Sequence, residues 1–130
     1  MAAFTATITE QIAISGLTSS SEHSYTGEMM PNYGPTSIAD AVTDRPLDIA
    51  IDVSEVTFFY ALASVAMTLE TNATDATGGN TLVLQAGKPY IWRTGDYDTF
   101  KLTLDVARIY VTNASGAAGT LTIRGAANPA

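Results

Sequence analysis

The chain has 130 residues, 46% of them hydrophobic, and carries 13 acidic against 6 basic side chains, for a net charge of −7 at pH 7. This length and apolar content suit a single domain with its own core. The Lys and Arg residues are scattered singly, whereas a nucleic-acid surface needs them clustered, so we expect no nucleic-acid partner. The chain has no cysteine, which excludes disulfides, thiolate catalysis and cysteine metal sites.

No stretch approaches the roughly 20 apolar residues of a membrane helix. Met1–Phe4 lacks the basic leader of a signal peptide, and polar threonines interrupt the apolar positions that follow. We therefore expect a soluble protein, made in a cytoplasm, with no membrane partner.

The first predicted element is a strand from Phe4 to Ile14, where apolar residues alternate with threonine and other residues. This two-residue period is typical of a pleated strand. Glu10 falls on the apolar side of the pattern, so we expect a bulge or bend there. Ser15 and Gly16 end the strand.

Residues 17–37 have no period and contain two prolines and glycines, so we expect a long irregular loop or arm. Long loops in compact domains are usually functional or mobile. Adaptable contact residues make the segment a candidate partner-binding surface: Tyr25, Met29, Met30 and Tyr33. In the alternative interpretation, the same side chains form a lid over the end of the chain's own core.

A turn at Asp44–Pro46 leads into the clearest alternation in the chain, over residues 47–53. We expect a strand there, with Asp48 and Asp52 on its outward face. Two outward acids indicate a strand with one side in water, or an edge protected by charge.

Residues 56–71 could form one buried helix or two strands joined near Ala63-Ser64. Val65, Met67 and Leu69 alternate with smaller or polar residues, and aromatic residues precede them, so two strands are favoured. A polar loop follows at residues 72–80.

The last third of the chain, residues 81–124, is a series of short apolar alternations separated by turns, the pattern of an all-β antiparallel sandwich or barrel. The expected strands cover residues 81–84, 90–92, 100–104, 109–111 and 121–123, with a turn at 113–116. Phe100, Leu102 and Leu104 are expected to share one face. Residues 125–130 are expected to form a flexible tail.

No constellation of residues indicates catalysis, and we expect no enzyme activity. His23, the only histidine, lies in a polar segment without the positioned nucleophile that a triad requires. Two pairs of acids could supply the carboxylates of a glycosidase, but we interpret both pairs as surface acids: Asp48 with Asp52, and Asp96 with Asp98.

Loops 75–78 and 95–98 offer oxygen ligands suited to calcium. Neither has the twelve-residue pattern of a helix-flanked calcium loop, so we expect ordinary turns, with no metal and no cofactor. The Asn-X-Ser/Thr triplets at Asn72 and Asn113 are interpreted as loop and turn chemistry rather than glycan acceptors.

Tyr90 and Trp92 flank Ile91, so they project to one face of their strand. On an exposed face the two rings could stack on a sugar. In a small domain, a single large aromatic pair more often belongs to the core.

Two segments, Leu84–Trp92 (LQAGKPYIW) and Leu104–Gly116 (LDVARIYVTNASG), resemble the hairpins of small virion proteins of tailed bacteriophages. The resemblance implies a capsid-associated β-sandwich, often a jelly roll, that acts as a decoration or cement protein. It further implies a virion location, trimers or other symmetric clusters, and the major capsid protein or other virion proteins as partners. The alternative is a head- or tail-associated carbohydrate or receptor-binding module that uses Tyr90 and Trp92. No residue's role carries over singly.

Overall fold

The computed structural model describes residues 3–75 and 77–128. In the first two strands, the side chains of some residues lie outside the description: those of residues 3–6, Ile8, Glu10, His23, Tyr25, Thr26 and Met30. The described residues form nine strands in antiparallel sheets, which confirms the all-β prediction. The strands are β1 (Ala3–Ile14), β2 (Leu17–Ile38), β3 (Arg45–Leu47), β4 (Val56–Ala63), β5 (Met67–Thr71), β6 (Thr81–Leu84), β7 (Tyr90–Arg93), β8 (Ile109–Thr112) and β9 (Gly119–Ala127). Within the described ranges, no helix has the length and apolarity to cross a membrane.

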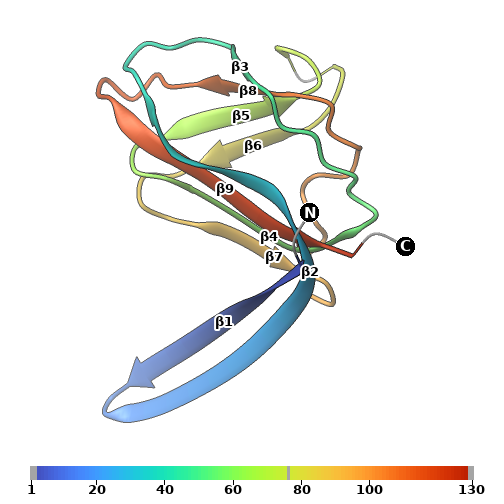
Figure 1. The fold of residues 1–130 in the computed structure, drawn as a ribbon. Coiled ribbons are helices and arrows are strands. Elements are labelled where there is room, and N and C mark those ends of the chain that lie inside the picture. The colour runs from blue at the N-terminus through green and yellow to red at the C-terminus, as the bar shows by residue number, and fades with distance from the viewer. Residues whose placement is uncertain (1–2, 76, 129–130) are drawn as a thin grey trace.

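Two sheets contain all nine strands (Figure 1). The first has the order β1-β2-β9-β4-β7, and the second has the order β3-β8-β5-β6. Residues 56–71 are two strands, β4 and β5, as the alternation of Val65, Met67 and Leu69 predicted. The β4 strand lies in the first sheet and β5 in the second, so the chain crosses between sheets at Ser64.

The two sheets share one hydrophobic core. Phe59 and Ala61 of β4 and Ile123 of β9 point into it from the first sheet and are fully buried. Leu69 of β5 and Val111 of β8 enter it from the second. Inward side chains alternate with partly exposed ones along β5, because a pleated strand with one covered face sorts its residues two by two.

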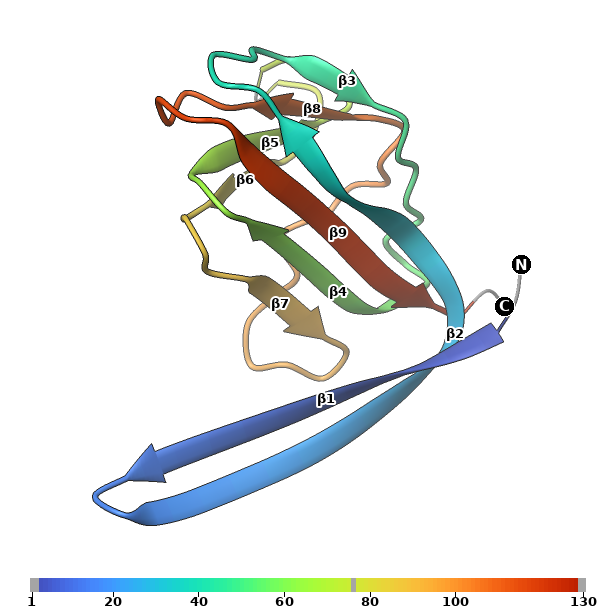
Figure 2. The same cartoon turned by 60° about the vertical axis from the view of Figure 1, so that its left-hand side comes forward.

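The first sheet extends beyond the core as a two-stranded ribbon (Figures 1 and 2). β1 pairs with β2 from Ala3↔Glu28 to Ile14↔Leu17 without a register shift, whereas β9 pairs with β2 only from Glu28 onward. We call residues 3–27 the arm and residues 28–128 the body. The arm leaves the body at Gly27.

The predicted irregular loop at 17–37 is wrong, because these residues form the strand β2. The expected bulge at Glu10 is also absent, since Glu10 pairs with Ser21 in unbroken register. The first error has a physical cause, because a period of two is expected where one face of a strand is buried, whereas the side chains of residues 17–22 are all exposed.

Two other boundaries differ from the sequence-based expectation. Strand β3 ends at Leu47, although Ile49 and Ile51 continue the alternation as buried residues. Ile51 forms only an isolated bridge, to Val106. The expected tail is strand as far as Ala127, because β9 pairs there with both β2 and β4.

The expected strand at 100–104 is not formed. Phe100 and Leu102 are buried as predicted, but Leu104 is 52% exposed and does not share their face. The alternation of Phe100 and Leu102 therefore predicts their burial correctly, but it wrongly predicts that their backbone pairs in a sheet.

Candidate functional site

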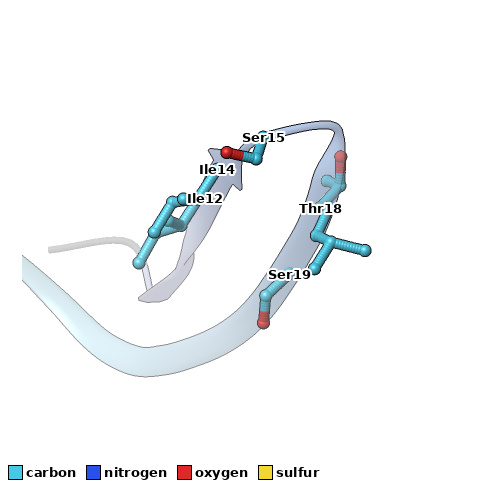
Figure 3. Close-up of a pocket in the computed structure, with 6 residues that line it drawn as sticks. Ile12, Ile14, Ser15, Thr18 and Ser19 are labelled. Carbon is cyan, nitrogen blue, oxygen red and sulfur yellow. The ribbon is translucent and has the colours of Figure 1, made fainter.

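The tip of the arm exposes three large apolar side chains. Ile12, Ile14 and Leu17 are 61%, 67% and 78% exposed. The register sets Ile14 opposite Leu17 and Ile12 opposite Ser19, so these four residues lie on one face of the ribbon. They line a surface hollow of about 360 Å³ together with Ser15 and Thr18 (Figure 3).

The tip of the arm has no charged residues. Residues 11–21 contain no charged side chain, and Glu10 and Glu22 bound them on the two strands. No lysine or arginine occurs before Arg45, so the arm carries acids and no strong base. The tip is therefore apolar and uncharged, with an acidic shaft behind it.

Both edges of the arm are open along most of its length. In the described residues, β1 pairs with β2 alone, and Leu17–Gly27 of β2 pairs with β1 alone. Natural edges are commonly protected by charged side chains, proline or a bulge; residues 3–27 contain no lysine, arginine, proline or bulge, and Glu10 and Glu22 are their acidic side chains. A two-stranded ribbon is marginally stable in water by itself, and beyond Glu28 the arm has no third strand beside it.

A tight turn and a clamped root hold the arm in shape. Ser15 and Gly16 have positive φ angles of 49° and 80°, as a two-residue hairpin turn of the primed type requires. At the root, Gly27 has a φ of 152°, and a Cβ there would collide with the carbonyl oxygen of Ala127. Only glycine lets β2 pass so close to β9 while turning out of the body.

Arg124 of β9 fastens the next part of β2. The register of β2 against β9 shifts between Tyr33 and Thr36, which takes carbonyl oxygens out of the ladder. The Arg124 guanidinium donates to the Gly34 carbonyl oxygen at 2.8 Å and to Asn32 Oδ1 at 2.6 Å. These bonds fix the body end of β2, from which the arm extends.

The predicted partner-binding residues do not gather at the tip. Tyr33 lies in the body and packs against the core, and Met29 is half-buried at the root, paired with Ala126. The side chains of Tyr25 and Met30 lie outside the description. Their role in binding a partner stays a prediction.

Sequence reasoning missed Ile12, Ile14 and Leu17 because it took the first two as members of an ordinary strand. The available signal was Ser15-Gly16, a two-residue turn between a period-two run and a polar run. Read as a hairpin, that turn would have paired residues 3–14 with the segment after it.

Tyr90 and Trp92 support a loop of the body. The Trp92 ring stacks on Phe100 with centroids 4.5 Å apart, and its Nε1 donates to the carbonyl oxygen of Asp98 at 3.2 Å. The Tyr90 hydroxyl accepts a bond of 3.0 Å from the Lys101 backbone N–H. Burial raises the pKa of Tyr90 above its usual value. The same residues border a hollow of about 610 Å³, lined also by Pro89, Ile91, Asp96 and Thr99.

The acids weighed for catalysis or calcium have local structural partners. Asp96 forms an ion pair of 3.3 Å with Arg93 and accepts the Arg93 backbone N–H. The Asp75 carboxylate accepts the hydroxyl and backbone N–H of Thr77, which lowers its pKa. Across the described residues, no group of three or more histidines and acids is placed to hold a metal ion.

The pair Asp48 and Asp52 is exposed on the surface of the body. Asp52 accepts hydrogen bonds from the backbone N–H and hydroxyl of Ser54, a local turn. His23 lies on the arm, and its side chain is outside the description.

Two asparagines hold the segment that was expected to be a strand. Asn80 Oδ1 accepts the backbone N–H groups of Thr103 and Leu104 at 3.0 and 3.2 Å. Asn72 Oδ1 accepts the N–H of Ala107 at 2.7 Å. Within residues 100–104, side chains thus accept the N–H groups of Lys101, Thr103 and Leu104 where a strand would bond a neighbouring strand, and Asn72 does the same for Ala107.

Comparisons of the chain with protein families, with curated proteins and with solved structures found no match.

Proposed function

We propose that this chain is a non-enzymatic virion structural protein that decorates or cements a bacteriophage capsid. In this proposal the arm links each copy to its neighbours on the shell. The partners are the major capsid protein, other virion proteins and further copies of the chain. The observation that carries the proposal is the arm itself: an apolar, uncharged tip on a ribbon with two open edges and no lysine, arginine, proline or bulge.

The strand order of the body supports a jelly roll. Along β2–β9, the first strand pairs with the last, the second with the second-last, and so inward: β2 with β9, β3 with β8, β4 with β7 and β5 with β6. This is a long hairpin rolled up on itself into a sandwich. Jelly rolls occur in viral capsid proteins and in lectins, so the support for function is an analogy of fold.

The energetics suit a cement. Each of Ile12, Ile14 and Leu17 adds roughly 1.5–3 kcal/mol when a partner fully buries it, before the costs of association are subtracted. One such contact is weak. Many copies on a shell bind together far more tightly than one, because each later contact is intramolecular.

The test is a variant with a shortened arm. Joining Thr9 to its partner Glu22 through an Asn-Gly turn removes residues 10–21 and keeps the register of the remaining ribbon. The variant is mixed with shells of the major capsid protein from the same genome, and bound protein is measured by co-sedimentation. We expect an unchanged far-ultraviolet spectrum of the body and loss of shell binding. Undiminished binding would contradict the role of the arm.

A carbohydrate-binding module is the second candidate, and one observation favours it. The hollow beside Tyr90 and Trp92 presents Asp98, Thr99 and Lys101 at its rim, groups that can bond sugar hydroxyls. The stacking of Trp92 on Phe100 argues for a structural role instead, because one ring face is already covered. Glycan-array binding that is lost in Asp98→Ala and kept in Asp75→Ala would favour the sugar site over the cement.

A further inference from the structure

The two sheets have four edge strands, and the chain protects only two of them. The edge strand β3 carries the charge of Arg45, and Pro46 has no backbone N–H with which to pair an added strand. At the edge strand β7, the N–H of Arg93 is capped by the Asp96 carboxylate at 2.9 Å. The remaining edges, β1 and β6, contain no lysine, arginine or proline.

The β6 strand resembles the arm tip in its surface. In the described residues β6 pairs only with β5, and Val83 at its centre is 66% exposed. Val83 separates two shallow hollows. One, of about 150 Å³, is lined by uncharged residues: Ala66, Met67, Thr68, Thr112, Ala114 and Ser115. The other, of about 140 Å³, is lined by Leu84, Gln85, Lys88, Pro89 and Tyr90.

The charges of the two surfaces are complementary. The arm carries Glu10 and Glu22 and no strong base. Lys88 is the one charged residue that lines either hollow beside Val83, and its side chain is exposed. An acidic shaft with an apolar tip thus fits an apolar edge with a lysine at its rim.

We propose that the arm of one copy docks on β6 of a second copy. The free edge of β1 adds to the free edge of β6, which sets Ile12 and Ile14 beside Val83 on the same face. This inference rests on the proposed function only in taking the arm to be a linking element, and it names the partner of the tip. Because the donor edge and the acceptor edge are different surfaces, the contact is head-to-tail, and copies joined in this way form a ring where the rotation between neighbours closes.

The test uses two variants that each damage one side of the contact. Ile14→Thr with Leu17→Thr removes apolar surface from the tip and keeps strand-forming residues. Val83→Lys puts a charge on the acceptor edge, the device that natural edges use against pairing. The controls are Ala13→Thr, on the opposite face of the tip, and Thr74→Lys, at an exposed loop position. The mass of each protein in solution is measured by light scattering after size exclusion, without any particle present.

We expect a closed oligomer for the native chain and both controls, and a monomer for each of the two damaged variants. A one-to-one mixture of the damaged variants should form a dimer, because one supplies an intact tip and the other an intact edge. Thermal unfolding shows whether each variant is folded, and the mixture reports the contact even if one variant is less stable.

Three results would overturn the inference: a monomeric native chain, an oligomer unaffected by Val83→Lys, or no dimer in the mixture. Shell binding that depends on the tip in a monomeric native chain would identify the capsid protein as the occupant. The proposed function would then stand and this inference would not.

Discussion

The Asn113 side-chain amide donates a hydrogen bond of 3.2 Å to the carbonyl oxygen of Ile38, joining the turn after β8 to the end of β2. The same Nδ2 also bonds the carbonyl oxygens of Ala39 and Ala117, at 3.1 and 2.9 Å. Asn113 is fully buried, and the two hydrogens of its Nδ2 are shared among these three carbonyl oxygens, of which the bond to Ile38 is buried. It ties the second sheet to the strand that becomes the arm.

Replacing Asn113 with alanine should therefore destabilise the body strongly. Buried carbonyl groups that lose their donors cost about 1–3 kcal/mol each, so we expect a loss of about 3 kcal/mol in the free energy of unfolding. Urea denaturation measures it. Asn128→Ala, at an exposed position, is the control and should change the value by less than about 0.5 kcal/mol. An equal effect of the two substitutions would contradict the role of Asn113.

Asn80→Ala should loosen residues 103–104 without unfolding the protein. The N–H groups of Thr103 and Leu104 lose their shared acceptor, and both residues are exposed enough for water to replace it. We expect a cost of about 1 kcal/mol and faster amide exchange at these two residues. Asn80→Asp retains the acceptor oxygen and should keep most of the protection. Equal exchange in both variants would show that the acceptor is not what holds the segment.

Two glycines of the ribbon offer a matched comparison. Gly16 and Gly27 both have positive φ, but a Cβ at Gly16 meets open space, while one at Gly27 collides with the Ala127 carbonyl. Gly16→Ala should cost about 1 kcal/mol of conformational strain in the turn. Gly27→Ala should in addition open the β2–β9 pairing at the root, seen as lost amide protection at Glu28 and Met29. Protection that is retained there would contradict the close approach of the two strands.

The ionisation of Tyr90 should make stability fall at high pH. Burial raises the pKa of Tyr90 in the folded protein above the ordinary tyrosine value of 10.0, so the unfolded chain releases this proton first. The stabilisation is fully present below pH 10.0 and is lost as the pH rises through the folded pKa. Tyr90→Phe should remove this part of the alkaline loss. A tyrosinate absorbance titration follows the group, and a profile identical in both proteins would refute the assignment.

The sequence predicts the strands whose one face is covered. Val56–Ala63 and Met67–Thr71 alternate because each has one face in the core, and Leu82 and Leu84 report the same. Residues 17–22 show no period, and their side chains are all exposed, so the local pattern gives no sign of a strand. Their extended form comes from pairing with β1 across the Ser15-Gly16 turn.

The prediction of a strand at residues 100–104 is wrong for a different reason. The alternation of Phe100 and Leu102 correctly reports burial. The backbone N–H groups of Lys101 and Thr103 between and beside them donate to side chains of distant segments, Tyr90 and Asn80, which no local period encodes. The apolar tip could not be predicted from the sequence either, because the exposure of Ile12 and Ile14 depends on where the ribbon projects and not on their spacing.

We propose that the arm is a linking element of an assembled virion. Electron cryomicroscopy of the intact particle from the genome that encodes the chain tests this proposal most directly. We expect a copy of the body on the capsid surface with the apolar tip, Ile12, Ile14 and Leu17, buried against a neighbouring subunit. A particle that lacks the polypeptide, or an arm that ends in solvent with its tip uncovered, would contradict it.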